Sequence, residues 1–185
     1  MAALGLPGAI AVFGNAVPIT LQTFGVMLVG SLLGARKGAL SMLVLLALVA
    51  AGLPLLAGGR GGLGVFAGPS VGYLLAWPIA AYVIGRIVEA GGPGYRWTRG
   101  LIANLVGGVA VIYALGIPLQ AWRTGVPLAE TAVLAAAFVP GDLVKAVLAT
   151  GVAGGVHRAM PDLLERPATP HDAPESSDAL ERPAP

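Results

Sequence analysis

The chain has 185 residues, of which 56% are hydrophobic and only 11% are charged, and its formal net charge at pH 7 is +2. Soluble domains carry about 25% charged residues, so this composition, with a mean hydropathy of +0.82, excludes a soluble globular domain and predicts an integral membrane protein. The chain has no cysteine, which excludes a disulfide framework and a thiolate site.

Six stretches have the composition of membrane-spanning helices, which need roughly 20 mostly apolar residues. The sequence therefore predicts an all-α integral membrane protein, a six-transmembrane-helix bundle. Only "ARKG" separates the second and third stretches, so we expect them to form an antiparallel hairpin. The predicted spans are residues 1–14, which is short, 20–36, 38–55, 69–88, 98–116 and 129–157.

Basic residues fall mainly on one side of this predicted bundle. Short cytoplasmic loops carry an excess of Lys and Arg, and only Arg60 and Arg123 fall on the opposite side. We therefore expect a multi-pass protein of the cytoplasmic membrane, with both termini in the cytoplasm and outward loops at 15–19, 56–68 and 117–128. The six residues on the cytoplasmic side are Arg36, Lys37, Arg86, Arg96, Arg99 and Arg158.

The last segment of the chain has a different composition. Six of the nine acidic residues lie in the final 24 positions, which are also rich in Pro. Such a segment has too little apolar surface to offset the entropy of ordering. We expect a transmembrane substrate-binding domain over residues 1–158 and a Pro-rich, acidic, disordered cytoplasmic tail over residues 159–185.

Small residues recur at four-residue spacing inside the predicted spans. Such ridges let helix backbones approach closely in lipid. Two interpretations stay open, packing within one bundle or a docking face for another membrane subunit. The ridges are Gly30, Gly34 and Gly38, then Gly151 and Gly155, and Gly5 with Ala9.

A glycine-rich loop precedes the fourth predicted span, with seven glycines in residues 58–72. Irregular backbone at membrane depth is tolerated only where it is buried in protein or lines a wet cavity. We therefore expect this outer loop to act as a lid, although an ordinary surface loop is the alternative. Arg60 in the loop either meets a carboxylate or is a solvated charge. The glycines are not followed by Gly-Lys-Ser/Thr, so they do not indicate a nucleotide site.

Two opposite charges interrupt the apolar run "FVPGDLVKAVLATG" at residues 138–151. Pro140 and Gly141 predict a break in the long sixth stretch, after which Asp142 and Lys145 share one helix face. A charge within the membrane costs at least about 2.5–3.5 kcal/mol and indicates a functional site. The alternative is a purely structural ion pair. Lys offers donors to a carboxylate or carbonyl and Asp accepts from N–H groups, so the pair predicts a small, mainly apolar ligand with an acid group and an amide-like head.

Three linked motifs resemble those of the BioY family, the biotin-binding S components of energy-coupling factor (ECF) transporters. They are "PITLQTFGVMLVGSLLGARKGALSMLVLLAL", "GLPLLAGGRGGLGVFAGPSVGYLLAWPIAAYVIG" and "FVPGDLVKAVLA", in this order. The resemblance implies that biotin is held near the outer face. It also implies one transmembrane coupling protein and two cytoplasmic ATPase subunits as partners, in contact with membrane lipid. It implies no enzymatic activity in this chain, and we expect no cofactor, metal or nucleic acid.

The same resemblance implies roles for individual side chains. Asp142 would accept from a ureido N–H, Lys145 would bind a ligand oxygen, and Tyr73 would pack on or hydrogen-bond the ligand. Further candidates for polar contacts are Thr20, Gln22 and Asn104, although Asn104 could equally satisfy a neighbouring helix. The alternatives are an S component for another small vitamin and a scaffold subunit without a ligand. Whether the chain works alone, with the coupling proteins or as a homo-oligomer stays open.

Overall fold

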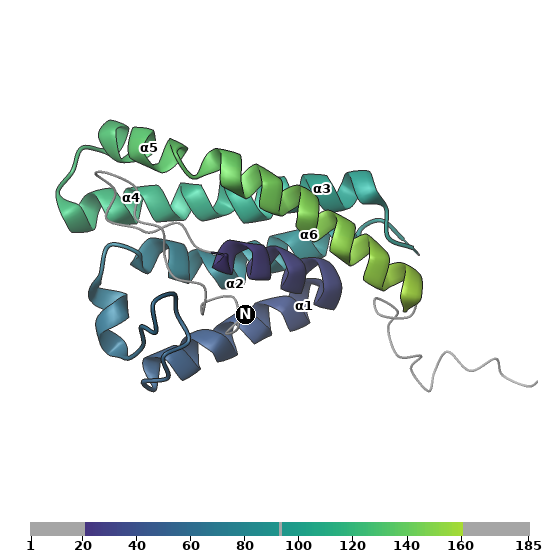
Figure 1. Cartoon of the computed structure of the whole chain (residues 1–185), viewed down its shortest axis with the longest axis horizontal. Helices are drawn as coiled ribbons and strands as arrows, with labels where there is room; N and C mark the ends of the chain where they lie inside the picture. Colours follow the sequence, from purple (N-terminus) through teal and green to yellow (C-terminus); the bar gives the residue numbers. More distant parts are fainter. Residues whose placement is uncertain (1–20, 93, 161–185) are drawn as a thin grey trace, which may run out of the picture.

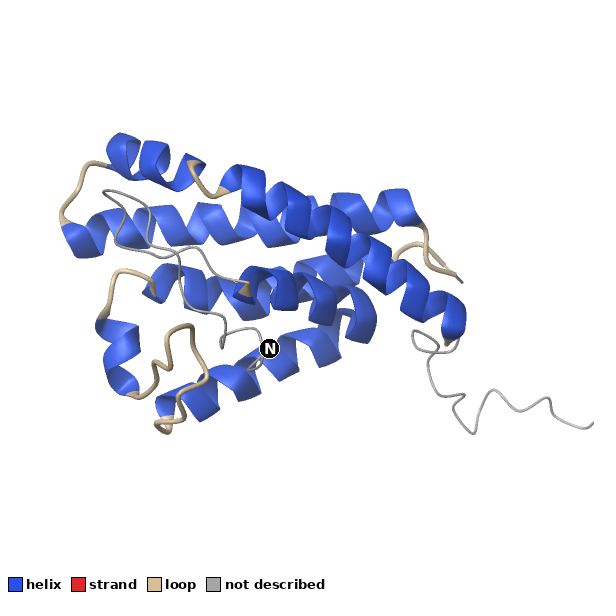
Figure 2. Cartoon of the chain, viewed as in Figure 1, coloured by secondary structure: helices blue, strands red, loops and turns tan. Residues whose placement is uncertain are grey.

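The structure, a computed structural model, describes residues 21–92 and 94–160. This part of the chain consists of helices joined by loops and turns, as Figure 2 shows. The predicted first span at 1–14, Thr20 and nearly all of the predicted tail lie outside the described residues. The elements are α1 (Gln22–Ala50), the short 3-10 helix η2 (Leu63–Ala67), α2 (Val71–Glu89), α3 (Trp97–Leu105), the π-helical segment η3 (Val106–Val111), α4 (Ile112–Thr124), α5 (Leu128–Ala136) and α6 (Val139–Ala159).

Four helical stretches in the described residues are long and apolar enough to cross a membrane. They are Gln22–Ala50, Val71–Glu89, Trp97–Thr124 and Val139–Ala159. In the most apolar part of α2, 67% of the residues are buried, whereas the corresponding share is 39% in each of the other three stretches, so α2 lies at the centre of the bundle. The all-α membrane fold is confirmed, and the count of six spans stays a prediction.

The first stretch, α1, reverses direction at Gly34. The φ of 75° and ψ of −175° at Gly34 are not helical, and glycine adopts this conformation without a Cβ penalty. Directly after the reversal, the backbone N–H of Ala35 donates to Glu89 Oε1 over 2.9 Å, where a carboxylate complements the start of a helix. Figure 1 shows the two arms of α1 running back along each other. This is the predicted hairpin, with its turn beginning one residue before "ARKG".

The glycine ridge of α1 packs inside the bundle. A Cβ at Gly30 would lie 2.8 Å from the Cβ of Ile84 on α2, and one at Gly38 would lie 3.3 Å from Gly30 Cα on the other arm. By contrast, Gly151 and Gly155 on α6 have open space where a Cβ would be. Packing within one bundle therefore explains the small residues at Gly30 and Gly38. It does not explain those at Gly151 and Gly155, which no other described residue approaches.

The stretch Trp97–Thr124 is longer than the predicted span at 98–116. The predicted span ends at residue 116, whereas the helix continues through Pro118 to Thr124. Gly125, with φ 71° in the left-handed region, provides the C-terminal stop. The π-helical turn at Val106–Val111 adds residues to the middle of the stretch.

The predicted sixth span at 129–157 is divided into α5 and α6. The interruption at residues 137–138 lies just before Pro140, which occupies the first turn of α6, a position where proline is favoured because its missing N–H is not needed. The predicted break is therefore confirmed, two or three residues earlier than expected. It places Asp142 in the first turn of a new helix.

Candidate ligand-binding site

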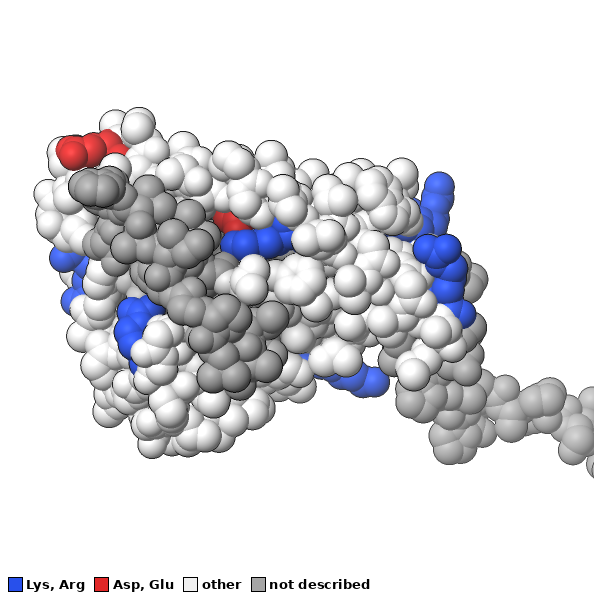
Figure 3. Space-filling view, viewed as in Figure 1, with Lys and Arg blue, Asp and Glu red and all other residues white. Residues whose placement is uncertain are grey.

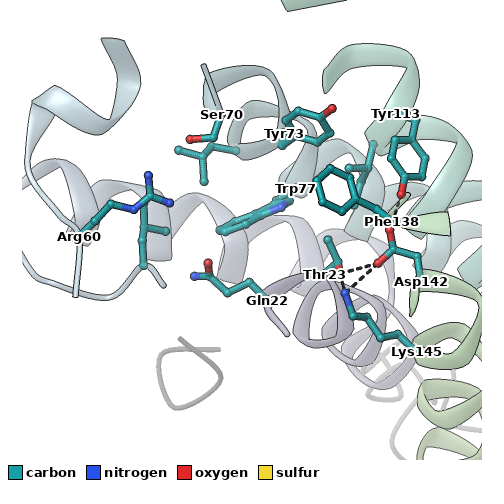
Figure 4. A pocket seen from close by; sticks show the side chains of 13 residues that line it. Gln22, Thr23, Arg60, Ser70, Tyr73, Trp77, Tyr113, Phe138, Asp142 and Lys145 are labelled. Atoms are coloured by element: carbon teal, nitrogen blue, oxygen red, sulfur yellow. Dashed lines mark hydrogen bonds and ion pairs between the residues drawn. The ribbon is translucent and has the colours of Figure 1, made fainter. Parts of the chain in front are cut away.

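A cavity of ≈ 70 Å³ opens between the start of α1, the glycine-rich loop and the beginnings of α2 and α6. Aromatic and apolar side chains form most of its wall, and a few polar groups converge on it, which is typical of small-molecule sites. Figure 4 shows the lining side chains. They are Gln22, Thr23, Leu56, Arg60, Ser70, Tyr73, Leu74, Trp77, Ile112, Tyr113, Phe138, Asp142 and Lys145.

Asp142 is the centre of a hydrogen-bond network at one end of this cavity. Its Oδ1 accepts from Lys145 Nζ at 2.9 Å and from Thr23 Oγ1 at 3.2 Å. Its Oδ2 accepts from the Tyr113 hydroxyl at 2.6 Å. Lys145 Nζ also donates to Thr23 Oγ1 over 3.1 Å. Three helices, α1, α4 and α6, therefore hold this carboxylate in a fixed position.

The ion pair of Asp142 and Lys145 is buried, with 5% and 8% of the two residues exposed. Removing two charges from water costs more than their attraction returns unless other hydrogen bonds satisfy the remaining groups. Thr23 and Tyr113 supply such bonds here. The pair is thus a structural ion pair whose charges are hydrogen-bonded, and it also lies on the cavity wall. The geometry is therefore compatible with a structural role and with ligand binding at the same time.

Two aromatic residues stand beside the pair. Tyr73 on α2 donates to Gln120 Oε1 over 2.8 Å, and its ring meets that of Tyr113 edge to face at 6.5 Å between centroids. Trp77, one turn further along α2, is only 4% exposed. Its Nε1–H is buried, with no hydrogen-bond partner among the described residues. A buried N–H without an acceptor is costly, so Trp77 is a donor suited to a ligand.

Gln22 connects α1 to the glycine-rich loop. Its Nε2 donates to the Leu55 carbonyl at 3.4 Å, and its Oε1 accepts from the Ala57 backbone N–H at 3.2 Å. The side chain therefore lines the cavity and also holds the loop against the start of the helix.

Arg60 lies on the same loop, at the other end of the cavity from Asp142 and Lys145, with Trp77 between them (Figure 4). Its Nε donates to the Ala57 carbonyl over 3.1 Å. Arg60 is exposed and meets no carboxylate among the described residues, so the structure agrees with a solvated loop charge, here one that borders the cavity.

The structure does not bring every predicted site residue to this cavity. Asn104 is fully buried, accepts from Ser31 Oγ at 3.1 Å and donates to Thr150 Oγ1 at 3.0 Å. It is not among the residues that line the cavity. The second interpretation of Asn104, satisfaction of neighbouring helices, therefore describes its position, and the prediction of a ligand contact for Asn104 has no support in this geometry.

Comparison with known proteins agrees with the motifs. Residues 1–162 match the model of the BioY family. This chain belongs to the BioY family. The match includes both halves of the cavity wall, from Gln22 to Lys145, so the predicted family resemblance is confirmed.

Individual relatives and one solved structure are similar over most of their length. A biotin transporter BioY of Rhizobium etli is 45% identical over 80% of this BioY chain and 81% of its own, and one of Rhodobacter capsulatus is 44% identical over 88% and 90%. A probable biotin transporter BioY of Bacillus subtilis is 44% identical over 86% of each chain. The crystal structure of an S component for biotin from an ECF-type ABC transporter superposes with a TM-score of 0.80, at 33% identity over 85% of this chain and 84% of that one.

Proposed function

We propose that this BioY family member binds biotin in the cavity beside Asp142 and Lys145, as the S component of an ECF-type transporter. The observation that carries the proposal is the buried pair at one end of an apolar cavity with a guanidinium near the other end. The biotin transporters among its relatives support the choice of ligand. The chain itself has no catalytic task, because a coupling protein and two cytoplasmic ATPase subunits would supply ATP hydrolysis.

The arrangement of polar groups suits the two ends of biotin. Ionised Asp142 accepts hydrogen bonds only, so it suits a ureido N–H, while Lys145 suits the ureido oxygen. The Trp77 Nε1–H, which lacks an acceptor in the described residues, offers a further donor. Arg60 suits the carboxylate because a guanidinium can bind it through two parallel hydrogen bonds. The apolar walls and the ring of Tyr73 then enclose the hydrocarbon part of the ligand.

We propose that the glycine-rich loop is the lid of this site. A cavity of ≈ 70 Å³ is smaller than the roughly 300–1,000 Å³ of typical ligand pockets, so binding requires movement of part of the wall. The loop is the wall segment outside the long helices. Its connections to the rest of the structure include the two hydrogen bonds of Gln22, one from the Gly62 N–H to the Val49 carbonyl at 2.7 Å and one from Arg123 Nη2 to the Phe66 carbonyl at 3.3 Å.

The remaining topology belongs to the same proposal. It includes six spans, with residues 1–14 as the first and the two arms of α1 as the second and third. It also includes a cytoplasmic-membrane location with both termini inside, and the domain boundary at residues 158 and 159. The excess of Lys and Arg at the end of the bundle away from the cavity supports this orientation.

Mass spectrometry of the ligand retained through purification tests the function. We expect biotin, bound one to one, and a rise in melting temperature when biotin is added to the ligand-free protein. A different vitamin in the spectrum would instead support an S component of other specificity. No retained ligand, together with no stabilisation by biotin, would support a scaffold subunit and contradict the proposal.

A further inference from the structure

A second cavity, of ≈ 260 Å³, lies at the far end of α2 from the ligand-binding site. Ile87 on the last turns of α2 and Ile102 on α3 form its apolar walls. Arg96, Thr98 and Arg99, at the start of α3, supply its polar lining. A concave surface that combines two guanidinium groups, a hydroxyl and aliphatic walls has the chemistry of a site for an amphipathic anion.

The two arginines have no carboxylate partner among the described residues. Within the described residues, the ion pair is that of Lys145 with Asp142, which lies at the ligand-binding cavity. The nearest acidic side chain in sequence, Glu89, accepts the Ala35 backbone N–H. In addition, Arg99 Nη1 is buried without a hydrogen-bond partner in this part of the chain. No described carboxylate therefore neutralises the positive charge of Arg96 and Arg99, and this charge can attract an anionic ligand.

The depth of the cavity matches the level of lipid headgroups. Arg96 directly precedes Trp97, where the membrane-spanning stretch Trp97–Thr124 begins. Trp97 is 47% exposed and Ile102, one turn deeper, is 56% exposed. Exposed Trp residues concentrate at the membrane–water boundary, so the arginines lie at that boundary and Ile102 faces the acyl region. The free backbone N–H groups at the start of α3 add a favourable field for an anion.

The surrounding surface carries the same sign of charge. Basic side chains gather at the end of the molecule where α3 begins and α6 ends, on the right of Figure 3. The turn of α1 contributes Arg36 and Lys37, and both are exposed. These charges attract anionic lipids generally, whereas the cavity lined by Arg96 and Arg99 adds a defined place for one headgroup.

We propose that this cavity binds the phosphate of an anionic phospholipid, with Arg96, Thr98 and Arg99 on the phosphate and Ile87 and Ile102 along the first acyl carbons. Basic pockets between membrane helices are known to bind such headgroups. This site is separate from the ligand cavity, so the lipid would bind to both the biotin-free and the biotin-bound protein.

Lipid binding to the purified full chain in detergent tests this proposal. Native mass spectrometry and melting temperature would be followed during titration with phosphatidylglycerol or with zwitterionic phosphatidylcholine. We expect preferential retention of phosphatidylglycerol. The double variant R96Q/R99Q should weaken that retention tenfold or more, because both guanidinium groups would lose their charge-assisted hydrogen bonds to the phosphate. The matched control R36Q/K37Q removes two charges from the same end and should weaken retention less than threefold.

Three outcomes would overturn the proposal. Equal losses in the two double variants would mean diffuse attraction by the basic end without a site. Equal retention of the two lipids by the unaltered protein would mean that the headgroup charge is not recognised. Stabilisation by inorganic phosphate or glycerol phosphate equal to that by phosphatidylglycerol would identify a soluble phosphate as the ligand.

Two further variants cover the case in which R96Q/R99Q does not fold. Arg96 is exposed, so Arg96→Gln alone should fold and weaken phosphatidylglycerol retention about fivefold, while Arg99→Lys should retain most of it. Unchanged retention in Arg96→Gln would also contradict the proposal. Biotin binding measured on the same samples should be unchanged in all of them, which separates this test from that of the proposed function.

Discussion

Tyr113 on α4 donates a hydrogen bond of 2.6 Å to Asp142 on α6, and this bond joins two helices at one end of the ligand-binding cavity. The Tyr113 hydroxyl holds Oδ2 of the carboxylate, so that Oδ1 faces Thr23 and Lys145. In this account the tyrosine is a positioning residue, because it fixes the group that would meet the ligand.

Tyr113→Phe should weaken biotin binding by about tenfold to a hundredfold while leaving the protein folded. A hydrogen bond to a charged group contributes about 1.5–3 kcal/mol, and the ring that packs against Tyr73 is retained. Isothermal titration calorimetry would measure the affinity. Tyr82→Phe, at a tyrosine that is 45% exposed on α2, is the matched control and should bind normally. Equal affinities for the two variants would exclude the positioning role.

Arg60→Gln should remove the preference for a ligand with a free carboxylate. The unaltered protein should bind biotin more tightly than biotinamide, because only the acid can pair with the guanidinium. In Arg60→Gln the two affinities should become similar. Arg36→Gln removes an exposed arginine at the turn of α1 that does not line the cavity, and it should keep the preference. If Arg60→Gln still discriminates as well as the unaltered protein, the carboxylate lies elsewhere.

Trp77→Phe should weaken biotin binding about fivefold to tenfold, because it removes the indole N–H and keeps an aromatic ring on the cavity wall. A net contribution of about 1 kcal/mol is usual for one neutral hydrogen bond. Competitive binding of a labelled biotin would measure the change. Trp97→Phe, at an exposed position outside this cavity, should have no effect on affinity. A normal affinity in Trp77→Phe would mean that the buried N–H is satisfied by water or by another part of the chain.

Gly34→Ala should destabilise the α1 hairpin without touching the ligand cavity. The φ of 75° and ψ of −175° at Gly34 disfavour any residue with a Cβ, at a cost of about 1–3 kcal/mol, and the added methyl would meet the Glu89 carboxylate. We expect a melting temperature several degrees lower. Gly151→Ala, where a Cβ meets open space, should be neutral. Equal melting temperatures for the two variants would show that the reversal at Gly34 does not depend on glycine.

The sequence predicted the parts of this protein that have local signals. Asp142 and Lys145 were visible as charges in an apolar run, and Pro140 with Gly141 predicted the break that sets them at the start of α6. Because a small glycine-flanked basic turn interrupts an apolar stretch, the hairpin of α1 was predictable too, within one or two residues of its reversal at Gly34.

Residues that matter through the packing of several helices were not predictable in the same way. Tyr113 and Trp77 look in the sequence like any aromatic residue on a membrane helix, and only the contacts with α6 and the loop distinguish them. For Asn104 the sequence leaves open a ligand contact and a contact with a neighbouring helix, because its partners Ser31 and Thr150 come from helices far away in sequence. The π-helical turn, which shifts the register of every later residue in that stretch, has no evident local signal.

Calorimetric titration of the purified protein with biotin, in parallel with Asp142→Asn and Glu130→Gln, tests the central claim most directly. Glu130 is an exposed carboxylate that does not line the cavity, so its neutralisation serves as the matched control. We predict one biotin per chain, a loss of at least a hundredfold in affinity for Asp142→Asn, and unchanged binding for Glu130→Gln. Unchanged biotin affinity in a folded Asp142→Asn variant would contradict the assignment of this cavity as the biotin site.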